Sequence, residues 1–311
     1  MTSPTTKKSF TSGHFALQID GHKTTTFLRN VSGGWVKAGV IDDPTGTSSH
    51  RIKSLGPVEV DPMSVEFGLA GSTPVLKWIQ GSWSRTWARR NGQITHADFN
   101  LKQTFEHWFY DALLLEATFP TLDANSREPA YLKCKWQAEN VRTLSTPNSN
   151  TQLQSDTPPD QKRWIPSAFR LRIDQFDGME YTSKIDSLTI KQGVKKMYTG
   201  KDRLPQIEPT GLQFPNIVGY ISLAHASRLL QWHDEYVVRG DKDPRAQLSG
   251  SIEFLTPDRK NSIFNINLFE AGLMYAQIED ATANAEQIKR VKFEIFVGRM
   301  SLDGADELSL A

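Results

Sequence analysis

The sequence has a single cysteine, Cys134, among its 311 residues. An internal disulfide is therefore excluded, and one thiol fits a protein that folds in a reducing compartment. Cys134 lies in residues 131–136 (YLKCKW), where apolar and polar residues alternate. We therefore expect a small buried apolar side chain at this position and not a nucleophile.

Long apolar runs and an excess of charge of one sign are also lacking. No run approaches the roughly eighteen apolar residues that a membrane-spanning helix needs, and the polar residues 1–9 do not resemble a secretory signal. The formal net charge is +1, which gives no support to strong attraction to nucleic acid or anionic lipid. We therefore expect cytoplasmic folding, no membrane anchor and no specific nucleic-acid partner.

What the sequence does contain is an internal repeat of domain length. A shift of 154 positions superimposes a strand-like segment, a glycine segment and a tryptophan: residues 15–20 (FALQID) on 169–174 (FRLRID), 37–40 (KAGV) on 191–194 (KQGV), and Trp78 on Trp232. Farther along, a shift of 159 superimposes Phe105 on Phe264 and Lys133 on Lys292. We ascribe the change to one insertion of five residues in the second copy. Such a repeat predicts two copies of one fold and favours symmetric or pseudosymmetric assembly.

A segment rich in Pro, Ser, Thr and Asn separates the two copies. Residues 143–160 contain no aromatic side chain, which is typical of a linker. We expect a first domain at residues 10–143, a linker at 144–163, a second domain at 164–302 and a tail at 303–311. Both domains have a common size and are large enough for a core of their own.

Within each copy the apolar residues recur with a period of two, which predicts antiparallel β-strands. In the first copy the expected strands lie at residues 15–20, 58–67, 105–110 and 131–141. In the second copy they lie at residues 169–174, 218–223, 252–255, 262–269 and 288–297.

One amphipathic helix interrupts the strands in each copy. In the first, residues 72–74 (STP) offer a cap and an early proline, followed by apolar residues at helical spacing. In the second, Leu229, Trp232 and Tyr236 share one stripe of residues 226–236. We expect Trp78 and Trp232 to anchor the cores. The predicted fold is mainly β (α+β), with two tandem antiparallel β-barrel or sandwich domains, each carrying one packed helix.

The matched glycines Gly39 and Gly193 are predicted to hold a backbone conformation closed to other residues. After each of them comes a long segment that lies at the same place in its copy, residues 41–55 and 197–214. A surface loop is the simpler interpretation of both segments.

Histidines and carboxylates gather in the second copy, at His225, His233, Asp234 and Glu235. These groups could bind a divalent metal or act as acid and base. However, the two histidines are eight positions apart, and their counterparts in the first copy are not metal ligands. We favour a polar helix face and predict no catalytic residue, no cofactor, no metal and no enzymatic activity; a metal hydrolase is kept as an alternative.

A second candidate cluster combines arginine with tryptophan: Arg85, Arg89 and Arg90 with Trp83 and Trp87. Such side chains can stack on the bases of a single-stranded nucleic acid. More often the arginine stems cover tryptophan at a domain surface, and we favour that interpretation.

The order of these segments resembles the tail tube proteins of contractile phages and related contractile injection systems, over nearly the whole chain. The pattern has a phenylalanine strand, a helix with tryptophan, a strand pair with a turn, and a close before the final long strand. The turn corresponds to residues 91–92 (NG) and 257–260 (PDRK), and the close to 122–125 (LDAN) and 281–284 (ATAN).

The resemblance implies a structural protein that builds rings. Rings of this family close with six domains that continue each other's sheets. An ordinary tube subunit has one domain, so three of these chains would form a trimeric, pseudo-sixfold hub or tube initiator that joins the tube to a spike. Six chains stacking two domain rings, as an inner tube protein, are the alternative. The implied partners are the chain itself and the tube, spike and baseplate proteins of a virion tail or injection particle.

The resemblance also suggests a role for the two long segments. Residues 41–55 and 197–214 would be extended hairpins or loops that grip the next ring, with His50, Arg51 and residues 201–203 in charged contacts. A duplicated β-domain that binds a small ligand is the last alternative, distinguished by a tight ligand and no ring.

Overall fold

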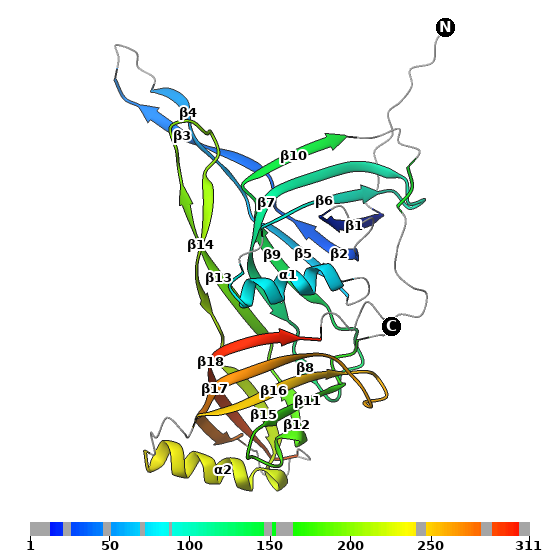
Figure 1. The fold of residues 1–311 in the computed structure, drawn as a ribbon, viewed down its shortest axis with the longest axis vertical. Coiled ribbons are helices and arrows are strands. Elements are labelled where there is room, and N and C mark those ends of the chain that lie inside the picture. Colours follow the sequence, from blue (N-terminus) through cyan, green and yellow to red (C-terminus); the bar gives the residue numbers. More distant parts are fainter. Residues whose placement is uncertain are drawn as a thin grey trace.

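The computed structural model describes residues 13–20, 26–45, 51–68, 72–86, 89–145, 151–153, 164–240, 247–280 and 288–304. Figure 1 shows two β-sheet bodies arranged along the long axis of the molecule, with one helix between them and another at the far end. The predicted class, mainly β with one α-helix per copy among the described residues, is confirmed.

The first body is a closed antiparallel barrel. Its strands are β1 (His14–Ile19), β2 (Thr26–Ser32), β5 (Met63–Phe67), β6 (Arg90–Ala97), β7 (Gln103–Phe119) and β9 (Leu132–Gln137). They follow the order β7-β6-β1-β2-β5-β9, and β9 pairs back with β7. The predicted strand at residues 131–141 is two strands, because β10 (Asn140–Ser145) is separate and pairs with the first half of β7.

The second body has the same order of neighbours but stays open. Its strands are β11 (Phe169–Ile173), β12 (Thr182–Ile185), β15 (Ile217–Ser222), β16 (Leu248–Leu255), β17 (Ser262–Ile278) and β18 (Arg290–Asp303). The order is β11-β16-β17-β18-β15-β12, and the short strand β8 (Leu122–Asp123) of the first copy follows β12. The second copy therefore forms a half-barrel.

The helices occupy corresponding places in the two copies. α1 (Thr73–Trp83) begins 154 positions before α2 (Ser227–His233), and α2 continues into a π-helical turn, Asp234–Val238. α1 lies between the two bodies, whereas α2 lies at the outer end of the second (Figure 1).

Strands extend into both segments that we expected to be loops. β3 (Val36–Asp43) pairs with β4 (Ile52–Val60), and β13 (Leu188–Met197) pairs with β14 (Gln206–Gln213), each as an extended hairpin. The loop interpretation is therefore wrong. A hairpin can be polar and exposed on both faces, so the period-two pattern that reveals a half-buried strand is missing.

Both hairpins contain an irregularity at the matched glycine. The register shifts between Ala38 and Val40 in one and between Gln192 and Val194 in the other. Neither Gly39 nor Gly193 has a positive φ. The predicted special backbone conformation is therefore wrong, and the shared feature is a β-bulge.

A second matched bulge lies in the longest strands. A shift of 159 positions superimposes the bounds of β7 on those of β17, and it superimposes Asp111 (φ 50°) on Glu270 (φ 58°). A positive φ is uncommon for residues other than glycine. Its occurrence at matched positions supports the repeat.

The pairing of these strands shows where the five additional residues of the second copy lie. Gly92 pairs with Phe109 and Gly250 pairs with Leu268, so β6 and β16 correspond at a shift of 158. One additional residue therefore lies in the turn after β16, and the other four precede that strand. The prediction of a single five-residue insertion is wrong.

The two predicted turns have different outcomes. Residues 257–260 form a turn after β16, in which the Asp258 carboxylate accepts the Lys260 N–H at 3.3 Å. Residues 91–92 lie inside β6 at the bulge, so that turn prediction is wrong. The first-copy turn follows β6, where Asp98 accepts the N–H groups of Asn100 and Lys102 at 2.8 and 2.9 Å.

The predicted core residues are buried. Trp78 is 1% exposed with its ring 5.7 Å from that of Trp136, and Trp232 is 4% exposed and stacks on Phe176 at 4.5 Å. Cys134 is fully buried, and burial raises the pKa of its thiol far above the ordinary value. The expectation of a buried apolar role for Cys134 is confirmed.

Only fragments of the predicted linker are described. Residues 144–145 belong to β10, and Gln152 forms an isolated bridge with Lys102. Residues 146–150 and 154–163, like residues 281–284 of the expected close, lie outside the described residues.

Candidate assembly interface

The two copies are joined by a strand pairing that we call the seam. β13 of the second copy pairs antiparallel with the end of β7 of the first. The paired residues are Leu188 with Phe119, Thr189 with Thr118, Ile190 with Ala117, and Lys191 with Glu116. β9 pairs with three of the same β7 residues, so it occupies the other edge. The seam therefore continues the first barrel into a hairpin of the second copy.

The inner face of the seam is packed like a protein core. Ala117, Phe119, Leu188 and Ile190 are all at most 3% exposed. The Phe119 ring lies 5.8 Å from that of Phe254 in the second half-barrel. Because a large apolar side chain contributes about 1.5–3 kcal/mol when buried, this face holds the copies together.

Helix α1 closes the inner face from the side. Its Ser82 hydroxyl donates a hydrogen bond to the side-chain oxygen of Gln192 on β13, and both residues are buried. The Trp83 ring lies 6.0 Å from Phe119 and 6.3 Å from Phe214, which follows β14. α1 therefore contacts both copies.

The copies also exchange a strand in the opposite direction. β8 of the first copy pairs with β12 of the second, with Leu122 opposite Ile185 and Asp123 opposite Lys184. Leu122 and Ile185 are buried. Each copy therefore contributes a strand to the other's sheet.

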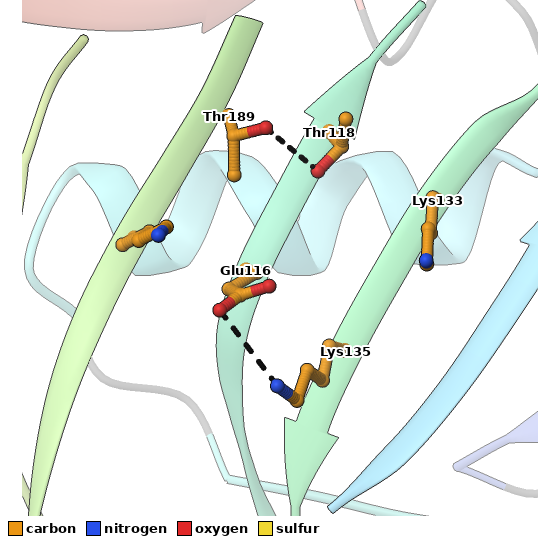
Figure 2. A pocket seen from close by; sticks show the side chains of 6 residues that line it. Glu116, Thr118, Lys133, Lys135 and Thr189 are labelled. Carbon is orange, nitrogen blue, oxygen red and sulfur yellow. Dashed lines mark hydrogen bonds and ion pairs between the residues drawn. The ribbon is translucent and has the colours of Figure 1, made fainter. Parts of the chain in front are cut away.

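The outer face of the seam is polar and rich in lysine. Figure 2 shows the shallow pocket on this face. Its lining residues are Glu116, Thr118, Lys133, Lys135, Thr189 and Lys191. The Thr118 and Thr189 hydroxyls are 3.0 Å apart across the seam, and the Lys135 ammonium is 3.8 Å from Glu116. Three lysines and one glutamate make the pocket positive.

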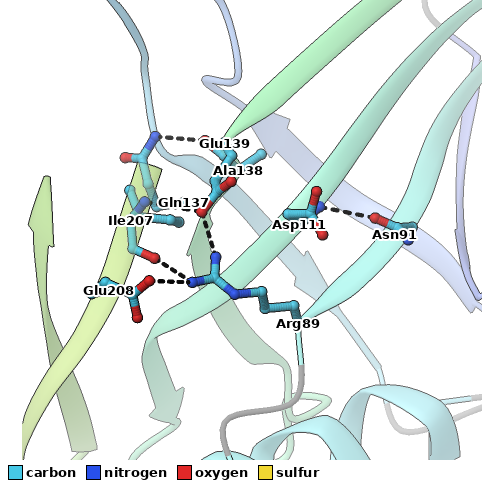
Figure 3. A network of polar contacts seen from close by, with 8 residues as sticks. All are labelled: Arg89, Asn91, Asp111, Gln137, Ala138, Glu139, Ile207 and Glu208. Atoms are coloured by element: carbon cyan, nitrogen blue, oxygen red, sulfur yellow. Dashed lines mark hydrogen bonds and ion pairs between the residues drawn. The ribbon is translucent and has the colours of Figure 1, made fainter. Parts of the chain in front are cut away.

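A network around Arg89 ties the second hairpin to the first barrel (Figure 3). The Arg89 guanidinium donates to the Glu139 carboxylate and to the Ile207 carbonyl, both at 2.5 Å, and lies 3.2 Å from Glu208. Glu139 also accepts the Ile207 N–H at 3.0 Å. These contacts fix the start of β14 against the first copy.

The arginine–tryptophan cluster expected from the sequence does not form among its described members. Arg90 donates to Asp20 at 2.5 Å, Trp83 is buried beside the seam, and Arg85 is exposed after α1. Trp87 lies outside the described residues. Arg89 is a clamp between the copies, a role that its sequence context did not indicate.

Ion pairs link the base of the first hairpin to the turn end of the second. Glu59 on β4 pairs with Lys196 on β13 and, at 3.3 Å, with Lys37 on β3; Lys37 also pairs with Asp61 at 2.6 Å. The hydrogen bond from Lys196 and then that from Lys37 hold the pKa of the Glu59 carboxyl below its ordinary value. Of the charged groups expected near the hairpin ends, Arg51 and Lys201 are exposed, and His50 lies outside the described residues.

The candidate metal ligands make other contacts. The His225 ring stacks on Tyr181 at 4.0 Å, Asp234 pairs with Arg239 at 2.7 Å, and Glu235 accepts a hydrogen bond from Gln231 at 2.8 Å. Across the described part of the chain, no three His, Cys, Asp or Glu side chains are grouped to hold a metal. His233, the last residue of α2, belongs to no such group either. The described helices include none that is long and apolar enough to cross a membrane.

Comparison with known structures finds chains of a contractile injection system, of the anti-feeding prophage and of Hcp1 proteins. A chain of the extended sheath–tube complex of the PVC extracellular contractile injection system is 17% identical, with a TM-score of 0.40, over 47% of this chain and all of that one. A chain of the anti-feeding prophage tube-terminating cap is 15% identical, with a TM-score of 0.38, over 45% and 93%. Hcp1 from Flavobacterium johnsoniae is 14% identical, with a TM-score of 0.27, over 44% and 95%.

Sequence comparison is more specific. No curated protein matches the chain. The family model described as T4-like virus tail tube protein gp19 matches residues 11–142. This match covers almost all of the first copy, in which the closed barrel, α1 and the β7 side of the seam lie. The predicted resemblance to tail tube proteins is confirmed over residues 11–142, the part of the chain that this family model matches.

Proposed function

We propose that the protein is a structural ring component of a contractile phage tail or injection particle, in which three chains supply six tube-like domains. The family match of residues 11–142 supports a tail tube role. The corresponding strand order of the two copies supports a second tube-like domain. We propose the domain limits given above, residues 10–143 and 164–302, for these two units.

The seam is the observation that carries this proposal. It joins two copies side by side by sheet continuation, and it uses different surfaces of each: the end of β7 on one and the start of β13 on the other. Such a heterologous contact, when repeated, either closes a ring or grows into a filament. With six domains per ring, as the resemblance to tail tube proteins implies, three chains complete the circle.

The seam also favours the trimer over six chains in two stacked rings. In a stacked arrangement, first copies would bind first copies laterally through the β7 edge. That edge, at residues 116–119, is already paired with β13 of the same chain. A ring of alternating first and second copies leaves this pairing intact. It also matches the role of a hub or tube initiator between a sixfold tube and a threefold spike, assembled in the cytoplasm with its tube and baseplate partners.

Native mass spectrometry and negative-stain imaging of the purified protein test the proposal. We expect a species of three chain masses and rings with six lobes around a channel. A monomer at every concentration would contradict a ring role, and a six-chain particle with two layers would support the inner-tube alternative. A tight small-molecule ligand without a ring would favour the binding module, and bound metal lost in His233→Ala would favour the hydrolase.

A further inference from the structure

Two strand edges that correspond to the seam lack a partner among the described residues. β3 corresponds to β13, but it pairs with β4 alone among the described strands. β17 corresponds to β7; β16 pairs with it only as far as Ala271, which leaves one edge of residues 272–278 unpaired within the described part of the chain. Unpaired strand edges are templates for another chain.

Side-chain burial shows the same contrast. Ile190 on β13 is 2% exposed, whereas its counterpart Val36 on β3 is 49% exposed. Phe119 on β7 is 1% exposed, whereas its counterpart Ile278 on β17 is 46% exposed. Two positions that are buried in the seam, those of Ile190 and Phe119, are therefore apolar and exposed at the unpaired edges.

More apolar side chains flank these positions. Trp35 next to Val36 is 54% exposed, and Met274 and Tyr275 on β17 are 45% and 40% exposed. At the helix the pattern recurs, because Trp83 is 5% exposed and its counterpart Val237 is 40% exposed. Exposed apolar groups gathered along an open edge indicate an interaction site.

We infer that β3 of one chain adds to β17 of the next chain, with the register that the seam provides. In that register Trp35 lies opposite Gln277, Val36 opposite Ala276, and Lys37 opposite Tyr275. The partner is a second copy of this chain. The inference rests on the proposed ring and assigns the surface that closes it.

The same register gives the contact between chains a different outer face. Trp35 and Tyr275 take the positions of Thr189 and Glu116, so they lie diagonally across the pair, within reach of each other. Glu294 on β18 takes the position of Lys135. The lysine-rich pocket of the seam therefore does not recur between chains, and the ring alternates between a positive and an aromatic outer face.

Disulfide trapping tests this register. Residues directly opposite in an antiparallel pair have Cα atoms about 4.5–5.5 Å apart, within the range that a disulfide spans. The only native thiol, Cys134, is buried, so it should form few unintended cross-links. The test variant carries Lys37→Cys with Tyr275→Cys and is oxidised as the assembled ring.

Two further variants serve as controls. Lys191→Cys with Glu116→Cys places the same pair on the seam, where it should form an intrachain disulfide without a change in mass. Lys37→Cys with Gln277→Cys is displaced by two residues on the same face, where separations of about 7–8 Å exceed disulfide reach. We expect covalent dimers and trimers, and nothing larger, only from the test variant.

The outcomes separate this inference from the proposed function. A ring in native mass spectrometry without cross-links in the test variant, or with equal cross-links in the displaced variant, would overturn the pairing and leave the ring standing. A chain that forms no ring would overturn both. A ladder that extends to six chains would overturn the three-chain closure.

Discussion

The first copy closes its barrel and the second copy does not. In the first, β1 pairs with β2 through Phe15 and Leu28. In the second, Ile173 at the end of β11 bridges back to Phe176 and a short 3-10 turn, Met179–Tyr181, follows, so the chain reaches β12 without pairing it to β11. β8 of the first copy takes the free edge of β12. The two copies therefore share one order of strands, and a different connection after the first strand leaves the second barrel open.

The largest loss of stability is expected from a substitution at the buried seam, compared with the same substitution at its exposed counterpart. Ile190→Asp would place an unpaired carboxylate in the packed face, and we expect a loss of about 5 kcal/mol of unfolding free energy or more. Urea titration followed by tryptophan fluorescence measures it. The matched control Val36→Asp should change the stability of the isolated chain by less than about 0.5 kcal/mol and yet abolish the ring. Equal destabilisation by both would show that the two positions are not counterparts.

Substitution of the two matched tryptophans compares how strongly each helix is anchored in its copy. Trp78→Ala and Trp232→Ala should each cost about 3–5 kcal/mol. The larger loss is expected for Trp78, because it packs against Trp136 of the barrel and belongs to α1, which contacts both copies. Trp232 belongs to α2, which lies at the outer end of the second body. Denaturant unfolding of each variant gives the values. Unchanged stability in either would contradict the anchoring role of that helix.

The matched glycines differ in the space that each hairpin leaves for a side chain. A Cβ at Gly193 would lie 2.2 Å from the Thr210 hydroxyl, whereas one at Gly39 would meet only the Pro57 carbonyl at 3.9 Å. Gly193→Val should therefore cost about 1 kcal/mol, since Thr210 must move, and Gly39→Val should be nearly neutral. Thermal melting of the two variants tests this, and equal tolerance would remove the asymmetry.

The smallest effect is expected where the hairpins touch. The folded-state pKa of Glu59 is depressed by Lys196 and Lys37, so its pairing stabilises the fold above the unfolded pKa and is lost as pH falls through the folded pKa. The contribution is about 0–1 kcal/mol, because the groups are partly exposed. Hydrogen exchange of β4, divided by the intrinsic exchange rate at each pH, should rise below about pH 4 and stay level near neutrality. Glu59→Gln should remove this pH dependence; an unchanged acid response would assign it to another group.

The sequence predicted the parts of the fold that carry a local signal. The repeat, most strands, both helices and the buried positions of Trp78 and Cys134 follow from periodicity and composition. The Asn91–Gly92 pair misled because a dipeptide typical of turns also suits a bulge. The outer parts of the two hairpins were missed because their side chains are mostly exposed on both faces.

The seam itself could not be predicted residue by residue. The pairing of Ile190 with Ala117 joins strands far apart in the chain, and neither segment contains a signal for its partner. Arg89 likewise gives no sign of its contact with Ile207. The repeat indicated only that similar surfaces would meet, and the tertiary arrangement selects which ones.

Because one polypeptide carries both sides of the seam, ring formation depends less steeply on protein concentration. Half of the domain contacts in the proposed circle form during folding, at an effective concentration set by the connecting chain and not by the number of molecules in the cell. Only two encounters between separate molecules then remain, and the third contact between chains forms when the ring closes. The proposed ring can therefore assemble at a low concentration of the chain.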